Sequence, residues 1–307
     1  MGLNVLSLFD GMSCGMIALE KAGIKVDNYY ASEVDKNAIK VSSNNYPSII
    51  RIGDVNKVSY KDGTLTTENG DFITKIDLLI GGSPCQDFSS ARAFGNNGQQ
   101  PKGLKGDKSS LFYEYLRIKK EIENENTDLV FLLENVRMKK ENKDSLDQYL
   151  GVIGKLINSE LVSYQKRARI YWTNIKFEQV VDRDVSFQNF KCKGNLDKYK
   201  VNKTPSRERM WNNGNGMNNS SSCANVTHSD KIYCLTTKQD RSPNSGLVEY
   251  EDFCRYLTQR ELELAQTVPI GYTSCLSYNQ ACAVLGNGWT VDVISHIFSG
   301  IKEKKHV

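Results

Sequence analysis

"LNVLSLFDGMSCGMIALEKAG" (residues 3–23) contains the two kinds of element from which the fold is predicted. Residues 3–9 are mostly apolar, as in a strand buried on both faces, and residues 14–23 have the pattern of a helix that ends at Gly23. Glycines in the intervening "FDGMSCG" (9–15) permit a tight turn and a close approach of a ligand to the backbone. An ordinary turn is the alternative interpretation. The stretch therefore predicts a strand, a turn and a helix in that order.

Strand and helix patterns keep alternating through the first half of the chain. Further strands are predicted at 26–32, 48–53, 76–81 and 127–135, and helices at 35–46, 109–123 and 145–158. This alternation predicts an α/β fold with a doubly wound, mostly parallel sheet that carries helices on both faces.

The alternation ends near residue 175. Residues 176–250 are polar and rich in Lys, Asn and Ser, and "WNNGNGMNNSSS" (211–222) is interpreted as a flexible loop. Helical patterns return at 258–266, 278–286 and 291–304.

The composition narrows the class of protein. With 39% hydrophobic and 25% charged residues among 307, the chain has the composition of a soluble globular protein. It has no apolar run near the ~20 residues of a membrane span and no signal-peptide pattern. None of its 8 cysteines forms a Cys-x-x-Cys pair, which argues against zinc and for a reducing, cytosolic setting. The net charge of +4 permits a nucleic-acid partner without requiring one.

Residues able to do chemistry follow five of the predicted strands. In chain order they are "FDGMSCG" (9–15), Glu33, Asp54, "GGSPC" (81–85) and Glu134. Open α/β sheets bind ligands beyond the carboxyl ends of their strands, so these residues are expected to meet at one edge. The first turn is not the G-x-G-x-x-G fingerprint, which makes a dinucleotide less favoured. Glu33 and Asp54 suit the ribose and the base of a nucleoside-like cofactor, or they are surface carboxylates near helix starts.

Cys85 and Glu134 are the candidate reactive groups. A cysteine in a turn after a strand is exposed and can become a nucleophilic thiolate, although a small buried thiol is the alternative. Glu134 follows an apolar run that could raise its pKa and let it share a proton, or it is a capping or salt-bridged carboxylate. In "QKRARIYW" (165–172), alternation along a strand would place Gln165, Arg167 and Arg169 on one face. Such arginines suit a phosphate, a carboxylate or a base carbonyl, or they are solvated charges on an exposed edge.

Five ordered stretches carry a family resemblance: LFDGMSCG, GGSPCQDFS, ENV, QKRARIYW and LGNGWTVDV. Together they resemble the motifs of the cytosine-5 DNA methyltransferases, over nearly the whole chain outside about 176–230. The details look closest to the catalytic domains of animal de novo methyltransferases and to phage or bacterial relatives. "LTQRE" (257–261) and "AQTVPIGYT" (265–273) depart from the family pattern at positions that belong to the scaffold.

The resemblance implies an S-adenosylmethionine-dependent methyltransferase fold and a mechanism. Cys85 would add to C6 of a cytosine flipped out of double-stranded DNA, and Glu134 would hold or protonate N3. Arg169 would bind O2 with support from Arg167, and C5 would take the methyl group of S-adenosylmethionine. The loop 86–108 would close over the base. Residues 1–175 plus 256–307 would form the catalytic domain, and 176–255 the target-recognition domain.

Two further sets of residues are implied by the resemblance, and no metal is expected. The cofactor site would be formed by Phe9, Asp10, Gly11, Met12, Ser13, Gly15, Glu33, Val34, Asp54, Val55, Gly82, Pro84, Asn287, Gly288 and Trp289. DNA would be contacted by Gln86, Ser89, Arg92, Lys200, Lys203, Arg207, Arg209 and Arg241. Residues 191–209 carry seven basic and two acidic side chains, a net charge of 7 − 2 = +5, which exceeds the +4 of the whole chain.

The main alternative is a tRNA cytosine-5 methyltransferase. The Cys-Phe-Thr signature of those relatives is absent, since the insert instead reads "SSCANVTHSD" (221–230). A catalytically inactive regulatory paralogue would not need both Cys85 and Glu134, and a small-molecule methyltransferase would not need the arginine strand or the basic insert. The enzyme is expected to act in the cytoplasm, encoded by a bacterium or a phage. A cognate restriction endonuclease and the oligomeric state are left open.

Overall fold

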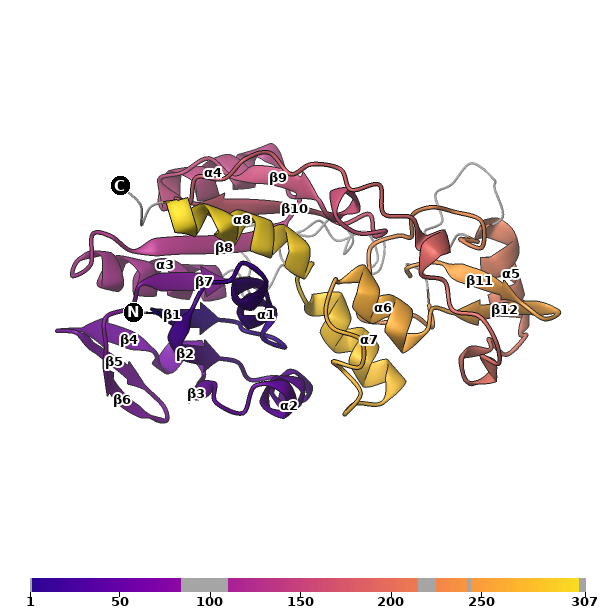
Figure 1. The fold of residues 1–307 in the computed structure, drawn as a ribbon, viewed down its shortest axis with the longest axis horizontal. Helices are drawn as coiled ribbons and strands as arrows, with labels where there is room; N and C mark the ends of the chain where they lie inside the picture. The colour runs from indigo at the N-terminus through magenta and orange to yellow at the C-terminus, as the bar shows by residue number, and fades with distance from the viewer. Residues whose placement is uncertain (1, 84–109, 215–224, 242–243, 304–307) are drawn as a thin grey trace. The chain divides into compact units, whose positions relative to one another are not determined.

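The computed structural model describes residues 2–83, 110–214, 225–241 and 244–303, which pack as two compact units (Figure 1). The first unit takes its described residues from 1–157, 168–178 and 295–307, and the second from 158–167 and 179–294. Packing thus groups residues 256–294 with the second unit, whereas the resemblance assigned them to the catalytic domain. Which unit recognises the target stays a prediction.

The first unit is built on a seven-stranded sheet with the strand order β3-β2-β1-β7-β8-β10-β9. β1 pairs in parallel with β2 and β7, as do β2 with β3 and β7 with β8, whereas β10 runs antiparallel to β8. This confirms the predicted α/β class with a mostly parallel sheet. The strands are β1 (Leu3–Leu8), β2 (Val26–Ser32), β3 (Ile50–Gly53), β7 (Leu78–Gly81), β8 (Val130–Val136), β9 (Lys155–Asn158) and β10 (Ala168–Thr173).

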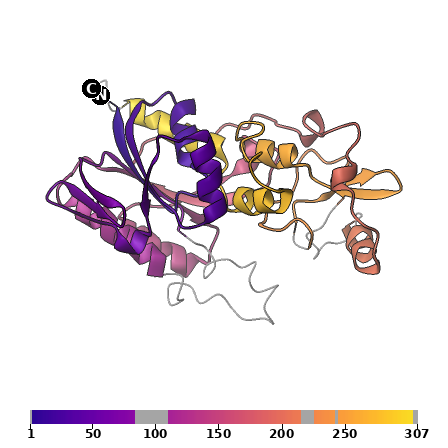
Figure 2. The same ribbon diagram turned by 90° about the horizontal axis from the view of Figure 1, so that it is seen from below.

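Helices lie on both faces of this sheet, with α1 and α3 on opposite sides (Figure 2). Most of them begin and end near the predicted positions, and the Asp35 side chain caps α2 by accepting from the N–H groups of Asn37 and Ala38. The helices are α1 (Cys14–Lys21), α2 (Lys36–Asn45), α3 (Ser110–Glu123), α4 (Lys140–Leu150) and α8 (Val291–Glu303).

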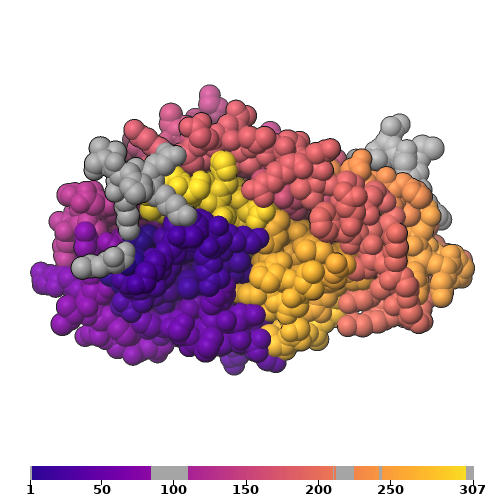
Figure 3. All heavy atoms as spheres, in the orientation of Figure 1, coloured from indigo at the N-terminus to yellow at the C-terminus, as the bar shows by residue number. Residues whose placement is uncertain are grey.

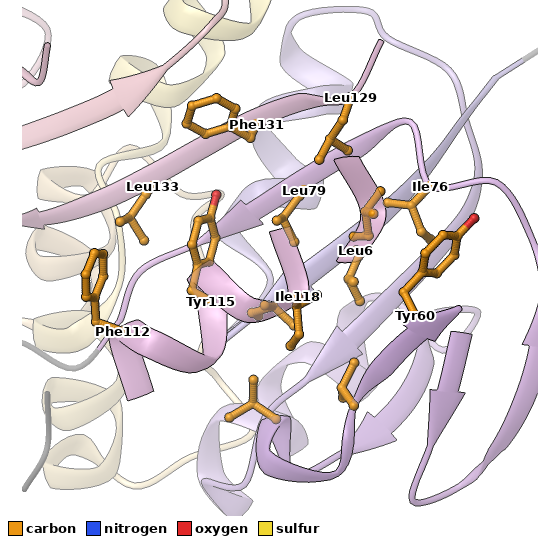
Figure 4. Packing of buried hydrophobic residues seen from close by; sticks show 14 of the residues in the cluster. Leu6, Tyr60, Ile76, Leu79, Phe112, Tyr115, Ile118, Leu129, Phe131 and Leu133 are labelled. Carbon is orange, nitrogen blue, oxygen red and sulfur yellow. The ribbon is translucent and has the colours of Figure 1, made fainter. Parts of the chain in front are cut away.

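The core between α3 and the sheet is aromatic and tightly packed. Tyr115 and Ile118 of α3 point at Leu79 of β7 and Leu133 of β8 (Figure 4), and all four side chains are fully buried. The Tyr115 hydroxyl donates to the Leu132 carbonyl at 3.1 Å, which satisfies its polar atom inside the core. This packing holds α3 firmly across the strands whose ends carry the candidate site.

A small antiparallel sheet follows β3 and was missed by the sequence analysis. It consists of β4 (Ser59–Lys61), β5 (Thr64–Thr67) and β6 (Gly70–Ile73), in that order. Its Tyr60 and Leu65 side chains are buried in the core of the first unit. This sheet, called the meander below, is therefore an integral part of that unit.

Two sequence predictions are wrong in the region that follows β8. The expected helix 145–158 is instead the end of α4, which stops at Leu150, followed by β9. Gly151 takes a left-handed conformation with φ of 69° directly after Leu150, and this ends the helix. The expected strand 165–172 begins only at Ala168, so Gln165 and Arg167 do not lie on it.

The second unit contains α5 (Pro205–Gly214), α6 (Gln259–Ala265) and α7 (Tyr278–Asn287), and its surface on one face is visible in Figure 3. Its antiparallel hairpin joins β11 (Leu247–Tyr250) to β12 (Phe253–Tyr256). Both α6 and α7 begin with capping boxes, at Thr258 and Ser277. Short 3₁₀ helices span Val55–Lys57 in the first unit and Ser159–Leu161, Phe187–Asn189 and Asp197–Tyr199 in the second.

The predicted loop 211–222 is described only at its start, where residues 211–214 form the end of α5, and its remainder lies outside the described residues. Among the helices of the described ranges, none is long and apolar enough to cross a membrane.

Candidate active site

Five neighbouring strands bring the predicted site residues to one edge of the sheet. Asp54, Glu33, Asp10 and Gly82 follow β3, β2, β1 and β7, and Glu134 lies near the end of β8. These strands are neighbours in that order and run parallel, so the residues line the carboxyl edge as predicted. The predicted Cys85, Pro84, Gln86, Ser89, Arg92 and loop 86–108 lie outside the described residues, beyond Ser83.

The turn after β1 is held in an unusual backbone conformation. Phe9, Gly11 and Ser13 have positive φ values of 57°, 60° and 62°, which side chains with a Cβ rarely adopt. A Cβ built on Gly11 would meet no atom of the described residues within 4 Å, so among these residues open space lies above this turn. Such a strained turn with open space above it is suited to a ligand that approaches the backbone closely.

The Asp10 carboxylate fixes this turn from inside the unit. It accepts hydrogen bonds from the Ser7 hydroxyl at 2.7 Å, the Ser13 hydroxyl at 2.5 Å and the Tyr29 hydroxyl at 2.8 Å. Its side chain is fully buried, and this burial raises the pKa of Asp10 although the hydrogen bonds act against the rise. Asp10 therefore shapes the turn by contacts within the protein.

Arg51 connects the same cluster to β3 and α2. Its Nη1 lies 3.5 Å from the Asp10 carboxylate, and its Nη2 donates to the Ser42 hydroxyl, which also contacts Ser13. The ends of β1 and β3 are thus joined through side chains.

Glu33 is anchored by the backbone around it. Its Oε2 accepts from the N–H of Gly11 at 2.7 Å, and its Oε1 accepts from the N–H groups of Val34 and Asp35, each at 2.8 Å. The carboxylate is half-buried, and the neighbouring Val34 side chain is 68% exposed. A carboxylate fixed in this way can accept further hydrogen bonds from a ligand without losing conformational freedom.

Asp54 caps the 3₁₀ helix after β3, where its Oδ1 accepts from the backbone N–H and the side-chain amide of Asn56 at 3.0 and 2.7 Å. Other predicted cofactor residues face inward. Met12 and Val55 are buried, and a Cβ on Gly15 would lie 2.4 Å from Ile80. Gly15 is therefore required where α1 packs closely on the sheet.

Glu134 of β8 and Arg169 of β10 form an ion pair across the two strands. Arg169 Nε lies 3.0 Å from Glu134 Oε1, and their side chains are only 15% and 11% exposed. A partly buried charge pair of this geometry orients both groups. The structure therefore brings together two residues that the resemblance assigns to the base, and it shows the salt bridge that was the alternative interpretation of Glu134. Their roles in catalysis stay predictions.

Asn135 is a site residue that the sequence analysis did not single out. Its amide donates to the carbonyl of Ser83 at 3.3 Å and to the Ser83 hydroxyl at 3.1 Å, and all of these groups are buried. Ser83 is the last described residue before Pro84 and Cys85. The signal was present in "ENV" (134–136), since an amide in a buried strand requires hydrogen-bond partners.

Arg167 has a different environment from Arg169, which corrects the expected common face. It belongs to the second unit, is buried, and donates to the carbonyls of Leu235, Gly286 and Gly288 at 3.2, 3.0 and 2.8 Å. Its guanidinium thus holds two distant backbone segments of that unit together.

The turn after α7 is fixed by a buried glutamine as well. Gln266 donates to the carbonyls of Leu285 and Gly288 at 2.6 and 3.0 Å and accepts from the Thr290 hydroxyl at 2.9 Å. Of the predicted cofactor residues, Asn287 ends α7 and Gly288 and Trp289 lie on this turn, all within the second unit.

The described basic residues of the predicted DNA surface are largely exposed, and several are paired with acids. Lys200 contacts Glu251 and lies 3.5 Å from Asp252, Lys203 lies 3.7 Å from Glu208, and Arg241 lies 3.2 Å from Asp240. Arg207 is half-buried and Arg209 is exposed. The positive charge of 191–209 is therefore partly neutralised in the folded second unit.

In the part of the chain that the structure describes, no group of three or more His, Cys, Asp or Glu side chains could hold a metal ion.

Comparison with known proteins gives one family. The sequence profile described as "C-5 cytosine-specific DNA methylase" matches residues 3–303. The orphan methyltransferase M.SPRI of Bacillus phage SPR is 29% identical over 64% of this chain and 43% of its own length. The DNA (cytosine-5)-methyltransferase DRM2 of Arabidopsis thaliana is 36% identical over 38% of this chain and 18% of its own. The matched regions thus span less than half the length of these curated relatives.

Solved structures share the fold. The Dnmt2 methyltransferase of S. pombe superposes with a TM-score of 0.73 at 17% identity, and the Entamoeba histolytica methyltransferase EhMeth with 0.75 at 14%, each over 100% of both chains.

Proposed function

The chain belongs to the C-5 cytosine-specific DNA methylase family, and on that premise we propose that it is a DNA (cytosine-5)-methyltransferase. It transfers a methyl group from S-adenosylmethionine to C5 of a cytosine flipped out of double-stranded DNA. The observation that carries this proposal is the Glu134–Arg169 pair between β8 and β10. Its Glu134 lies on β8, which is next to β7, the strand that precedes Cys85 in the sequence.

The proposed cofactor site lies at the ends of β1, β2 and β3. Bound S-adenosylmethionine supplies an electrophilic methyl group. Glu33 would hold its ribose hydroxyls and Asp54 its adenine amino group, and the turn 9–13 would lie next to its polar end. The open space above Gly11 and the three N–H bonds that fix Glu33 support this assignment. Asn287, Gly288 and Trp289, which the resemblance also assigns to the cofactor, belong to the second unit.

In the proposed reaction the protein activates the cytosine ring. The Cys85 thiolate forms a bond to C6, and the Glu134 carboxyl at N3 offsets the negative charge that this addition places on the ring. Arg169 orients Glu134 through the ion pair and binds the O2 carbonyl. After methyl transfer, water takes the C5 proton, and the electron pair of the C5–H bond expels the Cys85 thiolate from C6. N3 returns its proton to Glu134, which restores the aromatic ring.

Arg167 is proposed as a positioning residue, because its donors bind backbone carbonyls of the second unit. Residues 176–255 are proposed to read the DNA sequence, with phosphate contacts from the exposed basic residues. Action in the cytoplasm, by an enzyme that a bacterium or a phage encodes, belongs to the same proposal.

Methyl transfer from labelled S-adenosylmethionine tests the proposal directly. The purified protein is incubated in parallel with duplex DNA and with total tRNA, and bisulfite sequencing maps any methylated cytosine. Label in duplex DNA that disappears with Cys85→Ala supports the proposal. Label in tRNA with unmodified DNA would establish the tRNA alternative instead.

A further inference from the structure

The turn of the meander between β5 and β6 contacts the segment that carries Asp54. The Asn69 amide donates to the Arg51 carbonyl at 2.9 Å, and the Glu68 carboxylate accepts from the Asp54 N–H at 3.3 Å. The second oxygen of Glu68 binds the Lys57 ammonium. β5 and β6 lie beside β3 (Figure 1), so this turn reaches the edge of the sheet at the proposed cofactor site.

Gly53 shows how close this contact is. It has a φ of +79°, and a Cβ built on it would lie 2.5 Å from Glu68 Oε2. Its carbonyl also accepts from the Ser32 hydroxyl at 2.8 Å, directly before Glu33. The Glu68 carboxylate therefore packs against Gly53, which precedes Asp54 and is hydrogen-bonded to the residue that precedes Glu33.

The meander is held at its other end by α3 and the residues that follow it. Arg117 donates to the Val58 carbonyl at 2.7 Å, and Glu121 accepts from the Tyr60 N–H at 2.9 Å. Glu125 accepts from the N–H groups of Asp62 and Gly63 at 2.6 and 2.7 Å. A spacing of four residues places Arg117 and Glu121 on one face of α3, so the meander is fixed along its length.

Lys57 is the last residue of the 3₁₀ helix that Asp54 caps, and its N–H donates to the Asp54 carbonyl at 3.0 Å, so both Asp54 and Glu68 are its near neighbours. The carboxylates of Glu68 and Asp54 raise the pKa of its ammonium. Glu68 binds it directly, whereas Asp54 acts on it only through its charge. If Glu68 lost its charge, the Lys57 ammonium would be attracted to Asp54 alone. It would then compete for the carboxylate that is proposed to accept the adenine amino group.

We propose that Glu68 is a positioning residue for the cofactor site, which holds Lys57 away from Asp54 and so keeps the Asp54 carboxylate available to adenosine. This inference rests on the proposed function, since Asp54 is assigned to the cofactor there. The meander thereby affects cofactor affinity through the charge of Glu68, which itself makes no contact with the cofactor.

Calorimetric titration with S-adenosylmethionine and S-adenosylhomocysteine tests the inference on the full chain. Glu68→Gln, which keeps an oxygen for the Asp54 N–H, is expected to raise Kd roughly 3- to 10-fold. Lys57→Met alone is expected to leave Kd near the wild-type value, and Glu68→Gln with Lys57→Met is expected to restore it. The defect of the single variant should shrink at high salt, because the Lys57–Asp54 attraction is screened.

Asp27→Asn is the matched control, since Asp27 lies near the start of β2 and also faces a lysine, Lys25, at 3.4 Å. It should leave Kd unchanged. Wild-type affinity in Glu68→Gln, or a double variant as weak as the single one, would overturn the inference. A wild-type protein that binds neither compound would overturn the proposed function and this inference with it.

Discussion

Arg169 Nε lies 3.0 Å from Glu134 Oε1, and the two residues come from antiparallel neighbours in an otherwise mostly parallel sheet. Arg169 is the second residue of β10, and because β10 is antiparallel to β8, it lies beside the carboxyl end of β8, where the site lies. The pair thus depends on the reversed strand at this end of the sheet.

Glu134→Gln is expected to keep cofactor binding and to lose turnover by ~10²–10⁴-fold, because an amide cannot share a proton with the ring nitrogen. The amide oxygen can still accept from Arg169, so the fold should persist. Single-turnover methylation measures the loss, and calorimetry with S-adenosylhomocysteine checks the site. Methylation at close to the wild-type rate would remove Glu134 from the reaction.

Cys85 is expected to form a covalent adduct with cytosine. Duplex DNA that contains 5-fluorocytosine cannot lose its C5 substituent after methyl transfer, so a complex that survives denaturation should accumulate on a gel. Cys85→Ala should form none, whereas the half-buried Cys275, changed to Ala as the control, should leave trapping intact. Trapping by the Cys85 variant would assign the nucleophile elsewhere.

Glu33→Ala is expected to weaken S-adenosylmethionine binding because it removes both the proposed ribose acceptor and the acceptor for the Gly11 N–H. Glu33→Gln keeps one oxygen for the backbone and should bind with intermediate affinity. Thermal unfolding separates a local effect from a loss of fold. Equal Kd values for all three proteins would identify Glu33 as a carboxylate that only fixes the turn.

Arg167→Lys is expected to destabilise the second unit, because one ammonium cannot replace a guanidinium that binds three carbonyls. Gly288 keeps the hydrogen bond from Gln266, but the Leu235 and Gly286 carbonyls lose the guanidinium donor, and each loss costs about 1–3 kcal/mol, so Tm should fall by several degrees. If Arg167 contacted the base instead, kcat would fall while Tm stayed constant, and scanning calorimetry together with initial rates distinguishes the two results.

The positions of Glu33, Asp54 and Glu134 could be predicted from local sequence. Glu33 and Asp54 directly follow strands, and Glu134 lies near the end of one, and each of these strands is recognisable from its own apolar residues. Arg167 could not be placed in the same way. The alternating pattern of 165–172 includes three residues that precede β10, so Arg167 was assigned to a strand that begins only at Ala168. Its partner Gly288 lies 121 residues further along the chain. Local periodicity carries no information about such a contact.

The meander had a local signal that its short strands obscured. Asp62-Gly63 and Asn69-Gly70 are hairpin dipeptides, and Asp62 and Gly63 have positive φ values of 52° and 70°. Each flanking strand has only three or four residues, too few to establish a period of two against the surrounding polar residues. The turn dipeptides were therefore the better indicator here.

DNA affinity is expected to depend on basic residues that already have acidic partners. Lys200→Ala with Lys203→Ala should weaken binding to all sequences and reduce the salt slope by roughly one unit per lost phosphate contact. Glu251→Gln should do the opposite, because it removes the charge that holds Lys200 at the hairpin. Fluorescence anisotropy over a salt series measures both effects. Binding that is unchanged in both charge variants would remove these lysines from the DNA surface.

Exchange of 176–255 for the same region of a relative should move methylation to a new site while trapping by Cys85 persists. Methylation of the original site after the exchange would place sequence recognition outside residues 176–255.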